Sequence, residues 1–268
     1  ICFLLKSLRN LSEVILKFLY SFTLVLSLKR LLLKKENLLK ILFFVALVGV
    51  AVYFTYPKEL SEAQKMAYIT SYGTTLSLTV GGIAIGVVLG FIIAFVRFLN
   101  IRPINFVIDE YIDIIRGTPV LIQLMVFAFI VFATMSNSLY AAIIALGLNS
   151  SAYVAEIVRS GINSVDKGQM EAARAMGLTY SQSMKEVVFP QAIKNIVPAL
   201  ANEFISLFKE TSVVGMIGIF DLTMFSQSLQ ATLFTAKPIL FAAVIYYVSV
   251  KFFSLLVKIL ESRLNRND

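Results

Sequence analysis

The chain alternates between long apolar segments and shorter polar ones, and the apolar segments can cross a membrane as helices. The hydrocarbon core of a bilayer, ~30 Å thick, takes about 20 apolar helical residues. A first, shorter candidate comprises residues 38–56, in which Lys40 can snorkel to the membrane surface. Five further candidates follow at 72–98, 119–135, 139–158, 196–220 and 238–260. The pattern predicts an all-α, polytopic membrane protein.

Composition supports this class and excludes others. Of the 268 residues, 58% are hydrophobic and 15% are charged, and the mean hydropathy is +0.83, which is too apolar for a soluble domain of this size. The chain has no His, and Cys2 is its single cysteine. Disulfides within the chain, soft-ligand metal sites and His- or Cys–His-based catalysis are therefore excluded. No Gly-x-x-x-x-Gly-Lys-Ser/Thr stretch occurs, so any ATP must be bound by a partner.

The amino-terminal region is the least informative part of the sequence. It begins at Ile1 rather than Met, so the native start is left open. Lys6, Arg9 and Lys17 interrupt the first apolar run, which argues against a cleaved signal peptide. Residues 14–28 are short for a span. They can lie on the membrane surface, or they can cross the membrane and place the N-terminus outside.

The basic residues predict the orientation of the spans. The net charge is +8, and the cations gather at segment ends, which indicates topology signals and lipid headgroup contacts rather than nucleic-acid binding. Four clusters occur: Lys29, Arg30, Lys34 and Lys35; Arg97 and Arg102; residues 159–194; and Lys258, Arg263 and Arg266. An even number of predicted spans separates successive clusters. The positive-inside rule therefore places all four clusters, including the C-terminus, in the cytoplasm.

One predicted span carries a stripe of small residues. Gly82, Gly86 and Gly90 recur at four-residue spacing and are followed by Ala94. Small residues on one face allow another helix to approach closely, which is how helices associate in lipid. The alternative is that glycine is tolerated there at random. In either case the stripe concerns packing rather than ligand binding.

A polar loop at residues 161–194 interrupts the apolar pattern. Asp166 with Gln169, and Thr179 with Gln182, have the spacing of helix-capping pairs, so we expect two short helices. Gly177 between them can adopt a left-handed conformation and turn the chain sharply. We expect Ala172 and Ala173 to leave a thin helix face that fits a groove on another protein. Glu171 would lie near the helix N-terminus, where the helix dipole favours a carboxylate. The alternative is an ordinary amphipathic loop helix.

The loop resembles the coupling loop of importer permeases in the ATP-binding cassette (ABC) transporter superfamily. That family has Glu-Ala-Ala, three further residues, Gly, and a later Pro; here these are Glu171, Ala172, Ala173, Gly177 and Pro190. The resemblance covers residues 73–264 and points to the polar amino-acid branch of the family, of the histidine, glutamine and arginine type. Its further motifs are 73–76 (Gly-Thr-Thr-Leu), 116–124 (Arg-Gly-Thr-Pro-Val-Leu-Ile-Gln-Leu), 149–159, 161–162, 168–169, 190–192 (Pro-Gln-Ala), 202–205 (Asn-Glu-Phe-Ile) and 209–212 (Lys-Glu-Thr-Ser).

The resemblance implies a type I importer permease core of five helices, at 70–264, that works as a homodimer or heterodimer. Its partners would be two ATPase subunits, which bind the ATP and Mg²⁺, and an extracytoplasmic solute-binding protein. The permease itself would be a transport subunit without enzymatic activity, metal or cofactor, in the bacterial cytoplasmic (inner) membrane. The coupling residues would be Gly168, Glu171, Ala172, Ala173, Gly177 and Pro190. Residues 1–69, with the additional span, and Met170, where the family often has an aromatic, depart from the pattern.

Two polar stripes indicate a path through the bilayer. Asn195, Ala199, Asn202, Glu203, Ser206 and Glu210 share one helix face, and Asn149, Tyr153, Glu156 and Ser160 share another. An ionised carboxylate facing lipid is costly, so these stripes should face protein or water. We expect substrate contacts at Glu203, Asn149, Asn202, Gln123, Tyr153 and Ser206. If the stripes face each other, Asn149 and Glu203 can bind an ammonium group.

Other roles are open for some of these residues. Glu156 can be a structural partner of Arg159, one helical turn away, and Lys209 with Glu210 can form a structural pair. The function we expect is ATP-driven import of polar amino acids. An ion-gradient-driven secondary transporter would also need intramembrane acids, but no internal repeat is visible, and the loop would be unexplained. A membrane-embedded enzyme would have only Glu, Lys and Ser for its chemistry.

Overall fold

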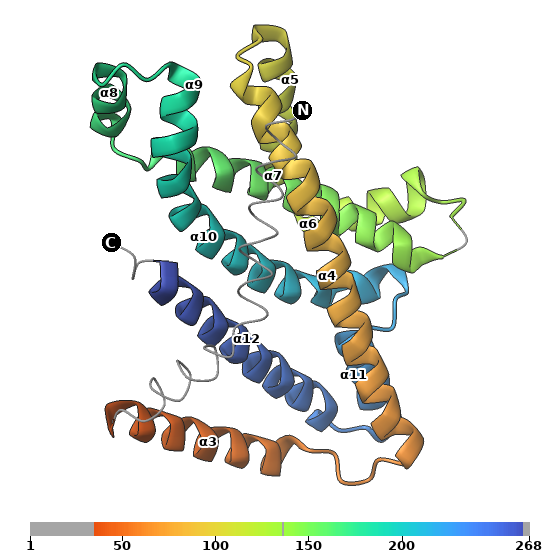
Figure 1. Ribbon diagram of the computed structural model, residues 1–268. Helices are drawn as coiled ribbons and strands as arrows, with labels where there is room; N and C mark the ends of the chain where they lie inside the picture. Colours follow the sequence, from red (N-terminus) through yellow and green to blue (C-terminus); the bar gives the residue numbers. More distant parts are fainter. Residues whose placement is uncertain (1–34, 136, 265–268) are drawn as a thin grey trace. The chain divides into compact units, whose positions relative to one another are not determined.

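A computed structural model describes residues 35–135 and 137–264, and every regular element in these ranges is a helix (Figure 1). The α-helices are α3 (Lys35–Thr55), α4 (Glu62–Phe98), α5 (Arg102–Gly117), α6 (Val120–Val126), α7 (Ser138–Asn163), α8 (Lys167–Ala175), α9 (Tyr180–Ser183), α10 (Phe189–Glu210), α11 (Leu222–Leu233) and α12 (Lys237–Leu264). Two π-helical segments, η1 (Phe127–Val131) and η2 (Met184–Val188), and a 3-10 helix, η3 (Thr211–Ile217), complete the set. The predicted all-α class is confirmed.

The chain divides into two units, Ile1–Tyr53 and Phe54–Asp268. Most of α3 belongs to the first unit, and its apolar part, Leu39–Thr55, is shorter than the helices that qualify as membrane spans. The helix expected at 38–56 therefore forms, whereas its crossing of the membrane stays a prediction. The surface segment and basic residues expected before Lys35 lie outside the described residues. The boundary expected at 69–70 also stays a prediction.

The second unit contains three helices that are long and apolar enough to span a membrane: α4, α7 and α12. Two bent pairs can each form one more span. Residues 102–131 bend by 108° and residues 180–233 by 52°, which gives up to five spans by length and composition. This agrees with the five predicted core spans. Helix α4, at 37 residues, is ~55 Å long, so it exceeds the thickness of the bilayer core.

Helix α4 starts ten residues before the predicted span because a capping box opens it. The Ser61 side chain accepts a hydrogen bond from the Gln64 backbone N–H, and the Gln64 side chain accepts one from the Ser61 backbone N–H. These two bonds satisfy backbone donors that the first helical turn leaves unpaired. A hydropathy pattern cannot detect this start, because the first turns of α4 are polar.

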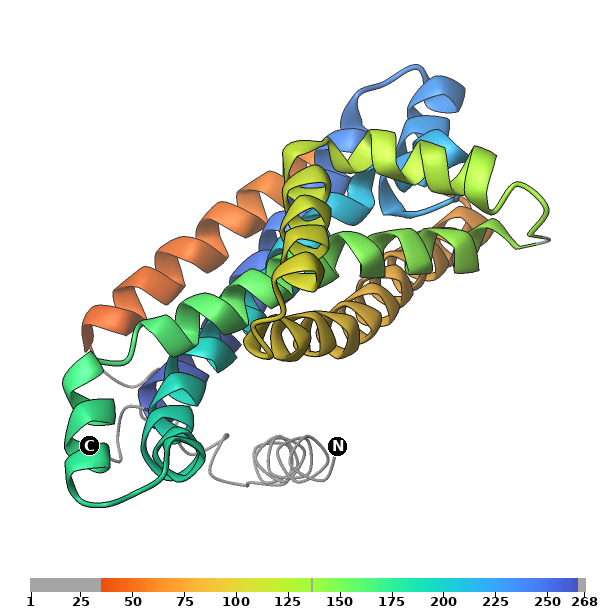
Figure 2. The same ribbon diagram turned by 90° about the horizontal axis from the view of Figure 1, so that it is seen from above.

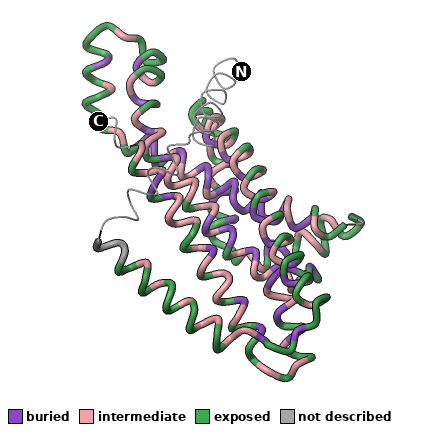
Figure 3. Tube along the Cα trace, turned by 60° about the horizontal axis from the view of Figure 1, so that its bottom comes forward, coloured by how far each residue is buried: buried purple, intermediate pink, exposed green. Residues whose placement is uncertain are grey.

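The small-residue stripe on α4 packs against α7, as predicted. Gly82, Gly86, Gly90 and Ala94 are all buried. A Cβ atom added at Gly86 would lie 2.7 Å from the Cβ of Ser150, and one at Gly90 would lie 2.5 Å from the Cβ of Val154. Figure 3 shows buried residues running through the helix bundle. Close approach of the two helices is therefore the structural role of these glycines.

Helix α5 and the break after it differ from the expected straight span at 119–135. Pro103 stands in the first turn of α5, and the amphipathic helix buries Ile112 and Ile115 in one cluster with Ala152 and Ala155 of α7. The chain then turns at Pro119 into α6, which continues as η1. The expected span is thus the second half of a bent pair, since its 12 helical residues are too few to cross a bilayer alone.

The span expected at 196–220 is also corrected. Helix α9 continues through η2 into α10, so the second helix of the polar loop is joined to the following span rather than separated from it. After α10 the chain continues as the 3-10 helix η3. This helix ends at Gly218, which has φ +82°. The buried side chain of Asp221 then accepts hydrogen bonds from the backbone N–H groups of Thr223 and Met224, which opens the unexpected helix α11.

Candidate functional site

Helix α8 of the polar loop begins at a side-chain cap. The Asp166 carboxylate accepts a hydrogen bond from the Gly168 backbone N–H, at 2.7 Å. The Gln169 side chain, expected to complete this cap, points elsewhere. Its oxygen accepts a hydrogen bond from the Gln191 amide of α10, at 3.1 Å. At α9 the predicted capping box of Thr179 and Gln182 is confirmed. Both predicted helices therefore start where the sequence indicated, and the first is tied to α10.

Gly177 ends α8 and turns the chain toward α9. Its φ is +89°, and it sits between two backbone hydrogen bonds: Leu178 N–H to the Ala173 carbonyl and Gly177 N–H to the Arg174 carbonyl. This is the Schellman arrangement, in which glycine adopts the left-handed conformation without a Cβ penalty. Among the described residues no atom lies within 4 Å of a Cβ added there, so the constraint is conformational. The predicted turn at Gly177 is confirmed.

The outer face of α8 differs from the expected one. Ala173 is only 1% exposed and faces its own chain, where α8 packs against α9 and η2, so it is not presented to a partner. Glu171 is the fifth residue of α8, outside the first turn where the dipole acts. Glu171, Ala172, Arg174 and Ala175 are exposed on α8, and Met176, directly after the helix, is 75% exposed. Figures 1 and 2 show α8 and α9 at the end of the bundle opposite α11.

The other coupling candidates have distinct positions. Gly168 is exposed in the first turn of α8, and Pro190 is exposed in the first turn of α10, directly after the π-helical segment η2. Met170 is half-buried against an apolar cluster of α7 and α10, which agrees with its expected role in packing. The part each residue plays in coupling stays a prediction.

Glu203 of α10 faces α7, and its partner there is Ser150 rather than Asn149. The Ser150 hydroxyl donates to the Glu203 carboxylate at 2.7 Å, and Ser150 is fully buried beneath Gly86. Asn149 and Glu203, which were expected to bind one ammonium group if their stripes face each other, thus have different side-chain partners, and their substrate contact stays a prediction. Ser150 was not predicted, because a serine in a membrane helix is common and carries no charge that marks it as a partner.

Asn149 bonds instead to Gln123, another candidate contact. The Asn149 side-chain amide donates to the Gln123 side-chain oxygen at 2.9 Å, and both residues are more than nine-tenths buried. The Gln123 amide in turn donates to the carbonyls of Ile115, at 2.6 Å, and Thr118, at 3.0 Å. These bonds satisfy carbonyls that the end of α5 leaves unpaired, so the pair stabilises the bend between α5 and α6.

Glu156 is the centre of a charge cluster. The guanidinium of Arg159 donates to both of its oxygens, at 2.9 and 2.7 Å, which confirms the structural pairing expected from the sequence. Arg97 of α4 donates to the same carboxylate at 3.0 Å, and Arg116 of α5 lies 3.7 Å away. The Arg116 guanidinium also lies over the ring of Tyr153, 5.5 Å from its centre. The cluster holds the ends of three helices together.

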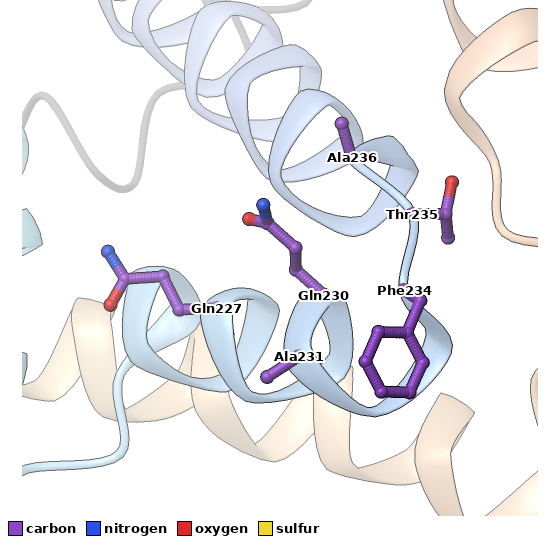
Figure 4. Close-up of a pocket in the computed structure, with 6 residues that line it drawn as sticks. All are labelled: Gln227, Gln230, Ala231, Phe234, Thr235 and Ala236. Carbon is purple, nitrogen blue, oxygen red and sulfur yellow. The ribbon is translucent and has the colours of Figure 1, made fainter.

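The remaining candidates are more loosely placed. Asn202 is exposed on α10, whereas Ser206 and Tyr153 are half-buried. A separate hollow of about 460 Å³ lies at the turn from α11 to α12, lined by Gln227, Gln230, Ala231, Phe234, Thr235 and Ala236 (Figure 4). It has no titratable side chain in its lining, and it lies away from the acids of α7 and α10. The substrate contacts expected at Asn202, Ser206 and Tyr153 stay predictions.

Comparison with known proteins defines the class to which this fold and loop belong. Residues 86–266 match the family described as the inner membrane component of binding-protein-dependent transport systems. This is more than half of the chain, so the chain belongs to that family. It is a membrane-spanning permease of the ABC importer class.

The similar proteins are amino-acid permeases. The arginine transport system permease protein ArtQ of Bacillus subtilis (strain 168) is 40% identical over 198 residues, 72% of this chain and 90% of ArtQ. The L-cystine transport system permease protein TcyB of the same organism is 36% identical over 196 residues, 72% of this chain and 84% of TcyB.

Solved structures agree with the fold. An amino acid ABC transporter, crystallised with histidines, has a chain 42% identical to this one, with a TM-score of 0.71, over 74% of this chain and 94% of that one. The methionine ABC transporter MetNI, in inward facing conformations, has a chain with a TM-score of 0.69 at 20% identity, over 77% of this chain and 100% of that one, so it shares the fold alone. The fold is that of a type I ABC importer permease.

Proposed function

We propose that this chain is the transmembrane subunit of an ATP-driven importer of polar amino acids, coupled to its motor through the loop 161–194. The relatives named for arginine and L-cystine transport support an amino-acid substrate. The working assembly would contain two permease chains, identical or related, and an ATPase dimer that binds ATP and Mg²⁺. An extracytoplasmic solute-binding protein would deliver the substrate. The loop and the C-terminus would face the bacterial cytoplasm, as the basic clusters indicate.

The observation that carries the coupling proposal is a short exposed helix that packs against the start of a membrane helix. Helix α8 is capped at Asp166, closed at Gly177 and buried along the side that carries Ala173. Beyond the turn, α9 continues through η2 into α10, the helix that carries Glu203. A force on the outer face of α8 would therefore act directly on the helix that bears the intramembrane acid.

Glu203 is the residue we propose for substrate contact. It is partly buried on α10, and among the described residues its carboxylate accepts a hydrogen bond from the Ser150 hydroxyl. A carboxylate has acceptor sites on both oxygens, so capacity remains for an ammonium group or a cationic side chain. An intramembrane acid is costly unless it has such a role. Asn202, Ser206 and Tyr153 would line the same pathway.

Transport would proceed by alternating access between two states. ATP binding closes the partner ATPases, α8 moves as a rigid lever, and the spans shift to expose the pathway first outward and then inward. The free energy for this change must come from contacts that differ between the two states, and the outer face of α8 is where a motor can make them.

The substitution Gly177→Val tests the proposal. A valine at φ +89° is strained by about 1–2 kcal/mol, so the turn would relax and the direction of α8 would change. We expect ATP-dependent uptake, measured after co-reconstitution with the cognate ATPase and solute-binding protein, to fall at least about tenfold. The amount of permease in the membrane should stay close to that of the parent protein.

The matched control is Gly73→Val in α4. That glycine is helical and has no atom within 4 Å of an added Cβ, so uptake should change little. Parental uptake by the Gly177→Val protein would contradict the lever. Uptake by this chain without the ATPase would support the ion-gradient alternative instead.

A further inference from the structure

A polar cavity of about 330 Å³ lies at the end of the bundle that carries the coupling loop. Four helices contribute to it: α4 and α7 with their last turns, and α5 and α9 with their first. The residues that matter for its chemistry are Arg97, Phe98, Asn100, Asn105, Arg159 and Tyr180. No acidic residue is part of this lining. The cavity is distinct from the pathway residues Glu203 and Ser150.

The two arginines of the cavity belong to a cluster with excess positive charge. Arg97 and Arg159 both bond to Glu156, and Arg97 also lies 2.8 Å from Asp109. Arg116 approaches the same Glu156 carboxylate. Three guanidinium groups thus face two carboxylates. Each guanidinium carries five N–H groups, and the described contacts of Arg97 and Arg159 use two on each. Donors and one net positive charge remain for an anion.

A second observation at the cavity is an unsatisfied acceptor. The side-chain oxygen of Asn105 is buried and has no hydrogen-bond partner among the described residues. Buried polar atoms of this kind are uncommon, because leaving one unpaired costs about 1–3 kcal/mol. A simple anion would satisfy the arginines but not this oxygen. A ligand that carries both a negative charge and a hydroxyl or amine donor can pair with the arginines and, once the Asn105 amide turns toward the cavity, with this oxygen, which has almost no accessible surface as it stands.

The rim of the cavity is apolar. Phe98, Leu99, Ile101 and Ile104, at the turn between α4 and α5, are between 39% and 54% exposed. They lie where the membrane-spanning part of α4 ends, so this surface is at the level of the lipid headgroups and upper acyl chains. Basic pockets between membrane helices bind anionic headgroups. A free anion gives no reason for an apolar rim, whereas a lipid does.

We propose that this cavity binds the headgroup of an anionic phospholipid that carries hydroxyl groups, as phosphatidylglycerol does. The phosphodiester accepts hydrogen bonds from Arg97 and Arg159. A glycerol hydroxyl donates to the Asn105 side-chain oxygen. The acyl chains cover the apolar rim. Because Tyr180 begins α9, a bound headgroup also contacts the coupling loop.

Tryptophan fluorescence can test the site directly, since the chain contains no Trp. The substitution Ile104→Trp places one probe on the rim, outside the residues of the cavity. The full-length protein is reconstituted in phosphatidylcholine vesicles that contain a fixed fraction of brominated phosphatidylglycerol, phosphatidylethanolamine or phosphatidylcholine. Bromine quenches only a nearby tryptophan. We expect phosphatidylglycerol to associate with the rim about fivefold more strongly than phosphatidylcholine.

Two variants and one control separate the cavity from general surface charge. Arg159→Gln removes a charge from the lining, and Asn105→Asp adds a negative charge without changing the shape. Both should reduce the preference for phosphatidylglycerol to near parity, and the second keeps every side chain of the Glu156 cluster. Arg102→Gln removes a charge from an exposed residue of the same end, and the preference should remain.

Four results would overturn the proposal. Equal quenching by brominated phosphatidylglycerol and phosphatidylcholine would show that no such site exists. An equal loss in Arg102→Gln and Arg159→Gln would show general attraction to the surface. Displacement of phosphatidylglycerol by inorganic phosphate, but not by sodium chloride of equal ionic strength, would show that the cavity takes a free phosphate. Equal quenching by phosphatidylethanolamine would show that the site does not require net negative charge.

Discussion

Replacing Gly90 by leucine is expected to remove most of the folded protein from the membrane. A Cβ at this position would lie 2.5 Å from both Cβ and Cγ1 of Val154, and 2.8 Å from the backbone oxygen of Ser151. The backbone of α7 cannot move aside locally, so α4 and α7 would have to separate. Overpacking of a tight contact costs about 3 kcal/mol, and this contact is the most extensive in the bundle. The yield of monodisperse protein and its thermal stability in detergent measure the effect.

The control is Gly73→Leu on the same helix. No atom lies within 4 Å of a Cβ added at Gly73, so leucine there should leave yield and stability nearly unchanged. Both variants introduce the same side chain into α4, so helix propensity and total hydrophobicity are matched. Equal stability of the two variants would mean that α4 and α7 do not pack as closely as described here.

Replacing Glu203 by glutamine is expected to abolish most of the uptake while the protein stays folded. Glutamine has nearly the same shape, and its carbonyl oxygen can still accept the hydrogen bond from Ser150. The change therefore removes the charge and keeps the local contact. Loss of one charge-assisted contact to an ammonium group corresponds to a fall in uptake of at least about tenfold. Initial rates of labelled amino-acid uptake by the reconstituted complex measure it.

Glu110→Gln in α5 is the matched control for this prediction. Glu110 is exposed and lies away from α10, so the same change in charge should leave uptake unaffected. If Glu203→Gln imports at the parental rate, the acid is a structural partner of Ser150. An equal loss of uptake in both variants would indicate an effect of total charge rather than of this site.

The main features of the fold could be predicted because they follow from periodic patterns. The apolar segments gave the long helices α4, α7 and α12, and the four-residue spacing of glycine located the contact surface of α4. The capping box at Thr179 and the left-handed turn at Gly177 could be predicted from residue type alone. Each of these features depends on residues that are close in the sequence.

The features that were missed give no clear signal in a hydropathy pattern. Helix α5 is too amphipathic for a hydropathy search, although Ile108, Ile112 and Ile115 have helical spacing. Helix α11 begins after Asp221, which caps it. This acid is buried in the structure, but from the sequence alone it resembles an ordinary loop residue. The bend after α5 depends on Gln123 reaching back to Ile115.

The candidate sites, too, could be predicted only in part. The coupling loop was located from its sequence, but the side of α8 that faces outward was not, because burial of Ala173 depends on the packing of α8 against α9 and η2. Glu203 was identified as an unusual intramembrane acid, whereas Ser150 as its partner required the crossing of α7 and α10. The spacing of a stripe predicts which face of a helix makes a contact. Which residue on that face makes it depends on how the helices pack.

Cross-linking tests most directly the claim that α8 docks onto a separate ATPase. The single native cysteine allows a clean background, Cys2→Ser, in which Ala172→Cys places one thiol on the exposed face of α8. Ala231→Cys places an equivalent exposed thiol on α11, at the opposite end of the bundle (Figure 1). In the assembled complex, a short thiol-reactive cross-linker should join the first variant, but not the second, to the ATPase subunit. A cross-link from Ala231→Cys and none from Ala172→Cys would contradict the account.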